Sequence, residues 1–481
     1  MGIKKFFKAA VNIAKNPVQL ITIGAAAATG QWYAIAAIAA STYGNYQTIK
    51  MEEKAAQQRQ AAKDAYNSSL QDRKINVLTT EAPFQVIYGE ARVGGAIAAV
   101  LKSGDKDQYR HIVVVHACHE VAEINTIWVG DESLGTLDAN GNCTTGKYAN
   151  QVRVKKHLGT AADPADASLI AECGSYWTAD HLLRGFAYTV VRIDLNQQDF
   201  QSGIPQINAL IKGKKLYDLR TGVTAWSDNP ALCIYDYLTQ DYGRGQPATN
   251  LVAQSFVDAA NDCDETINVG KRYTCNGSFK TDQDPKQVLD SLSDSMCGFT
   301  TQSGGWNIHA GVYREPVLAL TEDDLVGGIS VAPGSSLADL FNSVNGQFVN
   351  PDKAYAVTDY TPYRNSTFIA ADGEELYTDF TLHYTNSNQR CQNIARIIVE
   401  RARQSLVIDM PCNLKAWPLQ CGDRVTVTNS TFGWTNKVFR VIDWSFNTTA
   451  PVALTLQEDG EAVYDQSDEV SPDAFPNTGL P

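Results

Sequence analysis

The sequence predicts an α+β protein that is mainly β and that begins with a helical arm. The chain is rich in Thr, Val, Tyr and Gly, with 21 Tyr and 35 Gly among its 481 residues, and these residue types favour strands joined by tight turns. From about residue 75 short strand patterns follow one another, and helix patterns gather between residues 229 and 298. The length fits about three domains of ~150 residues each.

The N-terminal arm is the chemically most unusual segment. Between residues 3 and 14, apolar side chains recur at helical spacing and lysines fall elsewhere on the helical wheel, which predicts a basic amphipathic helix ending before Pro17. From residue 17 to residue 49 the chain has no charged residue. The residues that define the arm as a membrane or assembly segment are Phe6, Phe7, Lys4, Lys5 and Lys8.

Three hypotheses account for this arm. A signal peptide has a basic start, but Pro17 and the long uncharged run fit that pattern poorly. The uncharged run is long enough to span a bilayer, although Ala and Gly are only weakly apolar on insertion scales. The third hypothesis, which we favour, is an arm packed inside an assembly. Residues 50–74 are expected to form an exposed helix or spacer.

The following strands are recognised by their alternating or continuous apolar patterns. Residues 84–100 are predicted to form two strands that flank residues 89–92, and Gly94 and Gly95 then indicate a bulge or a close approach of two backbones. Further strands are expected at residues 111–117, 124–129, 152–157 and 185–195, with loops or a short helix at 138–147 and 159–181.

A helical region follows the first strands. Asn229 precedes Pro230, so Asn229 can cap a helix whose first residue is Pro230. A second helix fits residues 251–262. A third can begin with Asp284 as its cap and Pro285 at its first position.

The last third of the chain returns to strands. The glycines of residues 303–305 predict a hairpin. Residues 394–404 are expected to form a helix whose arginine-rich face is solvated. Strands at 423–428, 437–446 and 452–458 predict a small β-barrel. We therefore predict six segments: a basic, Ala-rich arm and spacer (1–74), a β-rich domain (75–200), a helical and mixed insert (201–300), an α/β domain (301–410), a small β-barrel (411–464) and a flexible tail (465–481).

Charge and cysteine usage exclude some classes of function. Residues 1–74 have a net charge of +6, and the rest of the chain has −19. An acidic body argues against a protein that grips nucleic acid, because affinity for phosphate depends on Lys and Arg. It remains compatible with a wall along which DNA slides. The ten cysteines include no C-x-x-C pair, so most are expected to be small buried residues of a protein made in a reducing cytoplasm.

The sequence contains few candidate metal-binding or catalytic groups. His116, Cys118 and His119 are the one cluster that resembles metal ligands, but no second pair of ligands has convincing spacing. We therefore predict no metal, no cofactor and no enzymatic activity. The chain has no G-x-S-x-G motif, no phosphate-binding loop and no dinucleotide fingerprint. A glycosidase with two distant carboxylates stays open at this point.

Several stretches, taken in order, resemble a known family. They are residues 86–95 (VIYGEARVGG), 109–131, 204–220 followed by 225–231, 273–305 and 422–427. Together they resemble the hub portion of the lambda tip attachment protein J family of phage tail tips, and the match covers about residues 75–458. The resemblance assigns architectural roles, fixing turns and helix starts, above all to Pro205, Gly213, Trp226, Asn229 and Pro230. The full motif set is Tyr88, Gly89, Arg92, Gly94, Gly95, Pro205, Lys212, Gly213, Tyr217, Asp218, Trp226, Asn229 and Pro230.

The resemblance implies a phage tail hub fold with tube-like β-barrel domains and a helical insert. It implies a structural subunit of the virion, assembled in the host cytoplasm, that forms a homotrimeric ring at the distal end of the tail. The expected partners are distal tail and tube proteins, the tape-measure protein, and receptor-binding or tip proteins. DNA would pass through the ring on genome ejection without specific binding, and the arm would contact the host membrane or the assembly.

Long members of the family continue into further domains, whereas this chain stops about twenty residues after the predicted barrel, so host recognition is expected to lie in another protein.

Two alternative functions come from other classes of protein. The first alternative is a secreted, β-rich glycan-binding or glycan-cleaving protein whose first forty residues are an export signal. The second is a membrane-penetrating virion protein that leaves the particle.

Overall fold

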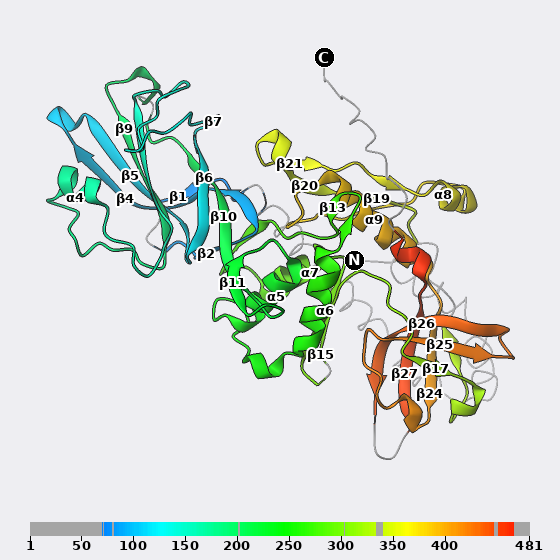
Figure 1. Ribbon diagram of the computed structural model, residues 1–481. Coiled ribbons are helices and arrows are strands. Elements are labelled where there is room, and N and C mark those ends of the chain that lie inside the picture. Colours follow the sequence, from blue (N-terminus) through cyan, green and yellow to red (C-terminus); the bar gives the residue numbers. More distant parts are fainter. Residues whose placement is uncertain are drawn as a thin grey trace, which may run out of the picture. The chain divides into compact units, whose positions relative to one another are not determined.

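The computed structural model describes residues 70, 72–78, 81–200, 203–302, 304–332, 340–446 and 451–465 (Figure 1). The chain divides into two units, residues 1–68 and 69–481, and the described residues all belong to the second unit. The arm residues Phe6, Phe7, Lys4, Lys5 and Lys8 lie outside the described residues, as does most of the predicted tail. None of the helices in the described ranges is both long and apolar enough to cross a bilayer.

Two five-stranded sheets form the first part of the described chain (Figure 1). The first sheet has the order β1-β4-β5-β9-β8, with strands Asn76–Val77, Gly95–Ser103, Tyr109–Ala117, Ala187–Asp194 and Val152–His157. The second has the order β11-β10-β6-β7, and β3 also pairs with β10; its strands are Val223–Trp226, Ile207–Asp218, Val121–Val129, Glu132–Ser133 and Glu90–Val93.

Strand β5 shows why the first sheet is apolar on both faces. Successive side chains of a strand point to opposite faces, and Ile112 and Val114 pack into the core shared with Ile127 and Ile211 of the second sheet. Val113 packs on the other side, in a smaller core with Leu169 and Cys173 of helix α4 (Ala167–Cys173). A sheet covered on both faces has continuous apolar strands.

The prediction of two strands in residues 84–100 is wrong, because three strands are present. β2 (Gln85–Tyr88) ends before Gly89, and β3 begins at Glu90, inside the segment that was expected to separate the two strands. Gly89 has φ +58°, a left-handed conformation that glycine adopts readily, and it separates the two strands. β2 then pairs with β14 (Gly277–Lys280), whereas β3 pairs with β10. The predicted close approach at Gly94 and Gly95 is present, against the backbone oxygens of Ile75 and Val115.

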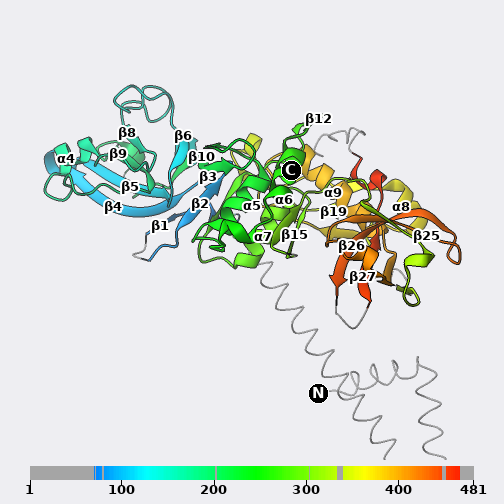
Figure 2. The same ribbon diagram turned by 60° about the horizontal axis from the view of Figure 1, so that its bottom comes forward.

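The predicted helical region is confirmed. Helices α5 (Pro230–Thr239), α6 (Ala253–Asp264) and α7 (Pro285–Asp294) form it, and α5 lies beside the other two (Figure 2). The hairpin of β15 (Phe299–Gln302) and β16 (Trp306–His309) follows where the glycines predict it. A small ladder of β12 (Thr266–Ile267) and β13 (Gly270–Lys271) lies between α6 and α7 in the sequence.

The next part combines short strands with two helices. Strands β19, β22 and β23 form one sheet and β20 and β21 a hairpin; they span Ser343–Asn345, Tyr363–Arg364, Tyr377–Asp379, Gln347–Asn350 and Ala356–Asp359. Helix α8 spans Ser366–Asp372 and α9 spans Asn388–Arg403. The expected solvated arginine face of α9 is wrong in part, because Arg401 and Arg403 pack over the rings of Tyr464 and Phe368.

A six-stranded sheet completes the described chain. Its order is β17-β25-β26-β27-β24-β18, with strands Leu318–Leu320, Arg424–Asn429, Trp434–Ser445, Val452–Glu458, Val407–Cys412 and Ser330–Ala332. The three strands expected at the C-terminal end are β25, β26 and β27. The sheet also takes strands from residues 318–332 and 407–412, so its core draws on both sides of the predicted boundary at residue 411. The six-segment division itself stays a prediction.

Candidate functional site

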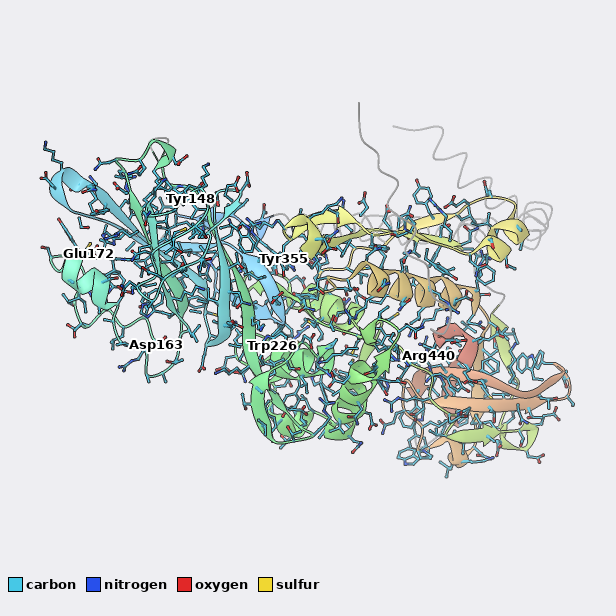
Figure 3. All side chains as sticks on the ribbon, turned by 45° about the horizontal axis from the view of Figure 1, so that its top comes forward. Tyr148, Asp163, Glu172, Trp226, Tyr355 and Arg440 are labelled. Atoms are coloured by element: carbon cyan, nitrogen blue, oxygen red, sulfur yellow. The ribbon has the colours of Figure 1, made fainter. Side chains whose placement is uncertain are left out.

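Three of the motif residues, Gly89, Gly213 and Trp226, meet between β2 and β3. The carbonyl oxygen of Gly89 accepts hydrogen bonds from the backbone N–H of Gly213, at 2.7 Å, and from the indole N–H of Trp226, at 3.1 Å. On its other side, a Cβ at position 89 would lie 2.1 Å from the carbonyl oxygen of Cys275. Glycine therefore lets the backbone at Cys275 approach closely, while the carbonyl oxygen of Gly89 joins β10 and β11. Trp226 lies beside this junction (Figure 3).

Gly213 does not fix a turn, contrary to the role expected for it. It lies within β10, where an added Cβ would stand 2.1 Å from the carbonyl oxygen of Ile87 in β2. Its small size lets β10 and β2 approach closely. Pro205 precedes β10, and Gly94 follows β3 directly. The motif glycines therefore mark places where backbones pack against each other.

A buried polar cluster links β2, β10 and α5. The carboxylate of Asp236, on α5, accepts a hydrogen bond from the hydroxyl of Tyr88 at 2.7 Å and pairs with the ammonium of Lys214 at 3.0 Å. The hydroxyl of Tyr242 donates to the same carboxylate. Burial, and then the charge of Asp236, raise the pKa of both tyrosines, so both stay neutral donors. Asp236 and Lys214 were not among the residues predicted from the sequence; a carboxylate within an apolar helical pattern was the available signal.

Arg92 connects the first sheets to the hairpin of β20 and β21. Its guanidinium lies 4.2 Å from the centre of the Trp128 ring and donates to the carbonyl oxygen of Ala354 at 3.0 Å. The ammonium of Lys74 donates to the same oxygen at 2.9 Å. Burial and the neighbouring charge of Arg92 lower the pKa of Lys74 to about 8. Two cationic donors thus converge on one backbone oxygen.

The hairpin that supplies this oxygen is strained. Ala354 and Tyr355 are consecutive non-glycine residues with φ of +50° and +58°, a conformation that persists only where the surrounding contacts enforce it. The hydroxyl of Tyr355 donates to the carboxylate of Glu90 at 2.7 Å, which adds a second link to β3 (Figure 3). These contacts hold the hairpin against the strand that carries Arg92.

Asp218 and Asn229 lie at the connection between β10 and the helices. The guanidinium of Arg220 binds both carboxylate oxygens of Asp218, at 2.9 and 2.8 Å, and reaches Asp264 of α6 at 2.8 Å. The side chain of Asn229 accepts from the N–H of Ala231 at 3.0 Å and donates to the carbonyl oxygen of Ala260 at 2.9 Å. It therefore begins α5, with Pro230 at its first position, as the sequence predicts.

The remaining motif residues are more exposed. Lys212 pairs with Glu123 at 2.9 Å on the surface of the second sheet, and its ammonium lies over the Trp226 ring. Tyr217 and the whole of β11 are exposed. The motif set thus combines a buried junction with one exposed two-stranded segment.

The predicted metal-like cluster is occupied by hydrogen bonds within the protein. Nδ1–H of His116 donates to the carbonyl oxygen of Gly94 at 2.5 Å, and Nε2 accepts from the hydroxyl of Thr189 at 2.9 Å. Nε2 of His119 accepts from the N–H of Ile87 at 3.0 Å. Burial lowers the pKa of both histidines to about 4. Across the described ranges, no three metal-ligating side chains gather.

The cysteines are free and mostly buried, as the sequence predicts. All ten are free, and eight of them are buried. They fill positions in the apolar cores, as Cys143 does in the core of the first two sheets.

Comparison with known proteins finds similarity both in sequence and in structure. No family model matches the chain. The chain is 23% identical over 328 residues to the baseplate hub protein pb3 of Escherichia phage T5. The matched region covers 61% of this chain and 34% of that protein. The chain therefore spans about a third of the length of the relative that it matches.

The structural match is broader. A chain in the virion of the native gene transfer agent (GTA) particle has a TM-score of 0.58 and 15% identity, with 82% of this chain and 89% of that chain covered. This match shows the fold, which is mainly β with few helices, as the sequence predicts. The sequence match is to a phage baseplate hub protein, whereas the structural match shows the fold alone. The narrower resemblance to the lambda tip attachment protein J family stays a prediction.

Proposed function

We propose that the chain is a structural hub subunit of a virion, placed at the distal end of a phage tail. The observation that carries this proposal is the 328-residue sequence match to a baseplate hub protein. The fold shared with a chain of the gene transfer agent particle supports it. In this role the chain joins the tail tube to tip proteins, and its partners are tube, tape-measure and receptor-binding proteins.

The finer part of the proposal is a ring of three copies through which DNA passes. The net charge of −19 beyond residue 74 suits such a passage, because like charges keep DNA from adhering to the wall. The junction around Gly89 suits a subunit whose task is to keep its shape, because its polar groups are engaged with one another. In this proposal the chain has no catalytic task.

Mass measurement tests the ring. The full chain has a mass of 52.5 kDa, and multi-angle light scattering on the purified protein should give three times that value over a range of concentrations. A monomer at every concentration contradicts the ring while leaving the hub role open. A gold-labelled antibody against residues 465–481 should mark only the distal end of purified tails. Particles that lack the polypeptide and still carry an intact tip contradict the hub role.

The arm needs its own test, because its role is a separate part of the proposal. We propose that residues 1–49 contact either the assembly or the host membrane. A synthetic peptide of these residues should release dye from liposomes if the arm acts on membranes. The matched control replaces Phe6 and Phe7 by Glu, which removes the apolar face. Absence of leakage by the unmodified peptide leaves packing in the assembly as its role.

A further inference from the structure

An apolar groove lies beside β1 and the start of β4. It encloses about 540 Å³ and is lined mainly by aliphatic and aromatic side chains. Leu78, Phe84 and Ile75 stand at its rim with 72%, 55% and 48% of their surface exposed. Single exposed apolar residues are common on protein surfaces, whereas several that surround a hollow mark a binding site. The volume lies within the range of ligand pockets, roughly 300–1,000 Å³.

Two polar donors stand together at the groove. Gln85 of β2 and Lys280 of β14 are directly paired across the two strands, and both line the groove. The amide nitrogen of Gln85 is buried and has no hydrogen-bond partner. For the ammonium of Lys280, no carboxylate lies within ion-pair distance in the part of the chain that the structure describes. A buried donor without a partner is unfavourable, so the Gln85 amide beside Lys280 calls for an acceptor.

Among the described residues that line the groove, none is acidic and Lys280 is the one that carries a charge. An amide N–H and an ammonium side by side complement a carboxylate, which accepts through both of its oxygens. The walls complement apolar side chains. The occupant that fits this arrangement is therefore an apolar chain that carries one carboxylate.

The backbone beside the groove indicates that the occupant is a peptide. β1 is the end strand of its sheet, and it pairs with β4 only at Gly95 and Ala96. From Ile97 to Ser103, β4 has no strand on that side within the described ranges. An open strand edge can hydrogen-bond to an extended peptide, and adjacent pockets then select its side chains.

We propose that this groove binds the extended, apolar C-terminal end of a partner polypeptide, with its terminal carboxylate held by Lys280 and Gln85. The peptide adds along the free edge of β4, and its apolar side chains enter the space between Leu78, Phe84 and the sheet. This docking site goes beyond the hub role and does not depend on the ring.

Two peptide probes test the site on the full chain. The first is a fluorescein-labelled hexapeptide of alternating Thr and Val with a free C-terminal carboxylate, and the second is the same peptide with a C-terminal amide. Fluorescence anisotropy should show the acid binding at least about tenfold more tightly than the amide, because the amide lacks the charge that Lys280 recognises. This comparison needs no variant. Equal binding of the two peptides overturns the carboxylate site.

Variants locate the binding. Lys280→Met keeps the apolar stem and removes the charge, so the acid should then bind no better than the amide. The control is Lys286→Met, which removes an exposed lysine of α7 and should leave the preference for the acid intact. Leu78→Glu should weaken both peptides, whereas Leu414→Glu, a change at an equally exposed residue of another part, should weaken neither. Circular dichroism of each variant checks that it is folded.

Two further outcomes decide the nature of the occupant. Hydrogen exchange of the β4 amides from Ile97 to Ser103 should slow when the acid peptide is bound, and unchanged exchange overturns strand addition. Decanoate is tested alongside the peptides. If decanoate binds and neither peptide does, the occupant is a fatty acid and the polypeptide proposal is overturned. If none of the three probes binds, the site itself is overturned.

Discussion

Arg424 and Asp459 form an ion pair from which solvent is almost excluded. Their side chains are 6% and 3% exposed, and Nε of Arg424 lies 2.8 Å from Oδ2 of Asp459. The guanidinium also donates to the carbonyl oxygen of Val312, and the hydroxyl of Tyr464 donates to the carboxylate. This pair therefore ties the segment before β17 and the segment after β27 to the C-terminal sheet.

Asp459→Asn should destabilise the C-terminal sheet by about 3–5 kcal/mol, because it leaves the charge of Arg424 buried without its partner. Urea unfolding followed by tryptophan fluorescence measures the loss, since Trp434 and Trp444 lie in this sheet. The neighbouring change Glu458→Gln is the control: it breaks a more exposed pair with Lys437 and should cost about 1 kcal/mol or less. Equal losses in the two variants would contradict the importance of burial.

Gly89 and Gly130 separate backbone strain from lack of space. Their φ angles are nearly the same, +58° and +64°, but an added Cβ meets Cys275 in the first case and nothing within 4 Å in the second. Gly130→Ala should cost only the strain of the left-handed conformation, about 1–2 kcal/mol. Gly89→Ala should cost about 1–3 kcal/mol more because neighbouring backbones must move. Urea midpoints of both variants measure this, and equal losses would show that the junction yields easily.

Asn229 should matter more than an ordinary helix cap. Asn229→Ala removes the cap of α5, worth about 1 kcal/mol, and leaves the carbonyl oxygen of Ala260 without its donor, which costs about 1–3 kcal/mol more. Asp284→Ala is the matched control, because Asp284 caps α7 through its carboxylate at an exposed site. It should cost about 0.5–2 kcal/mol. Thermal unfolding distinguishes the two, and a smaller loss at Asn229 contradicts its second role.

The parts of the fold that depend on nearby residues were predictable. Asn229 followed by Pro230 defines a helix start within two residues, and the structure has α5 there. Strand β5 was recognisable because its apolar run is continuous, which is typical of a strand covered on both faces. In each case the signal and the structure that it specifies lie in the same short segment.

The parts of the fold that depend on contacts between distant residues were not predictable from the sequence. Gly213 carries no local sign that it faces the backbone of Ile87, so its place within a strand could not be read from its neighbours. Lys74 and Arg92 meet Ala354 across 280 and 262 positions of the chain. The candidate site was therefore identified by resemblance of its motifs, whereas its polar links to Asp236 and Ala354 became visible only in three dimensions.

Acid should destabilise the protein through its buried histidines. Burial lowers the pKa of His116 and His119 to about 4, from an ordinary value of 6.5. Between these values the unfolded chain binds protons that the folded chain does not, so the free energy of unfolding falls as the pH drops below 6.5. Each such histidine contributes a slope of up to about 1.4 kcal/mol per pH unit. Urea unfolding between pH 7.5 and 5.5 measures the slope, and in His116→Gln, which cannot take up a proton, the slope should be smaller by one histidine. An unchanged slope would mean that His116 does not resist protonation in the folded chain.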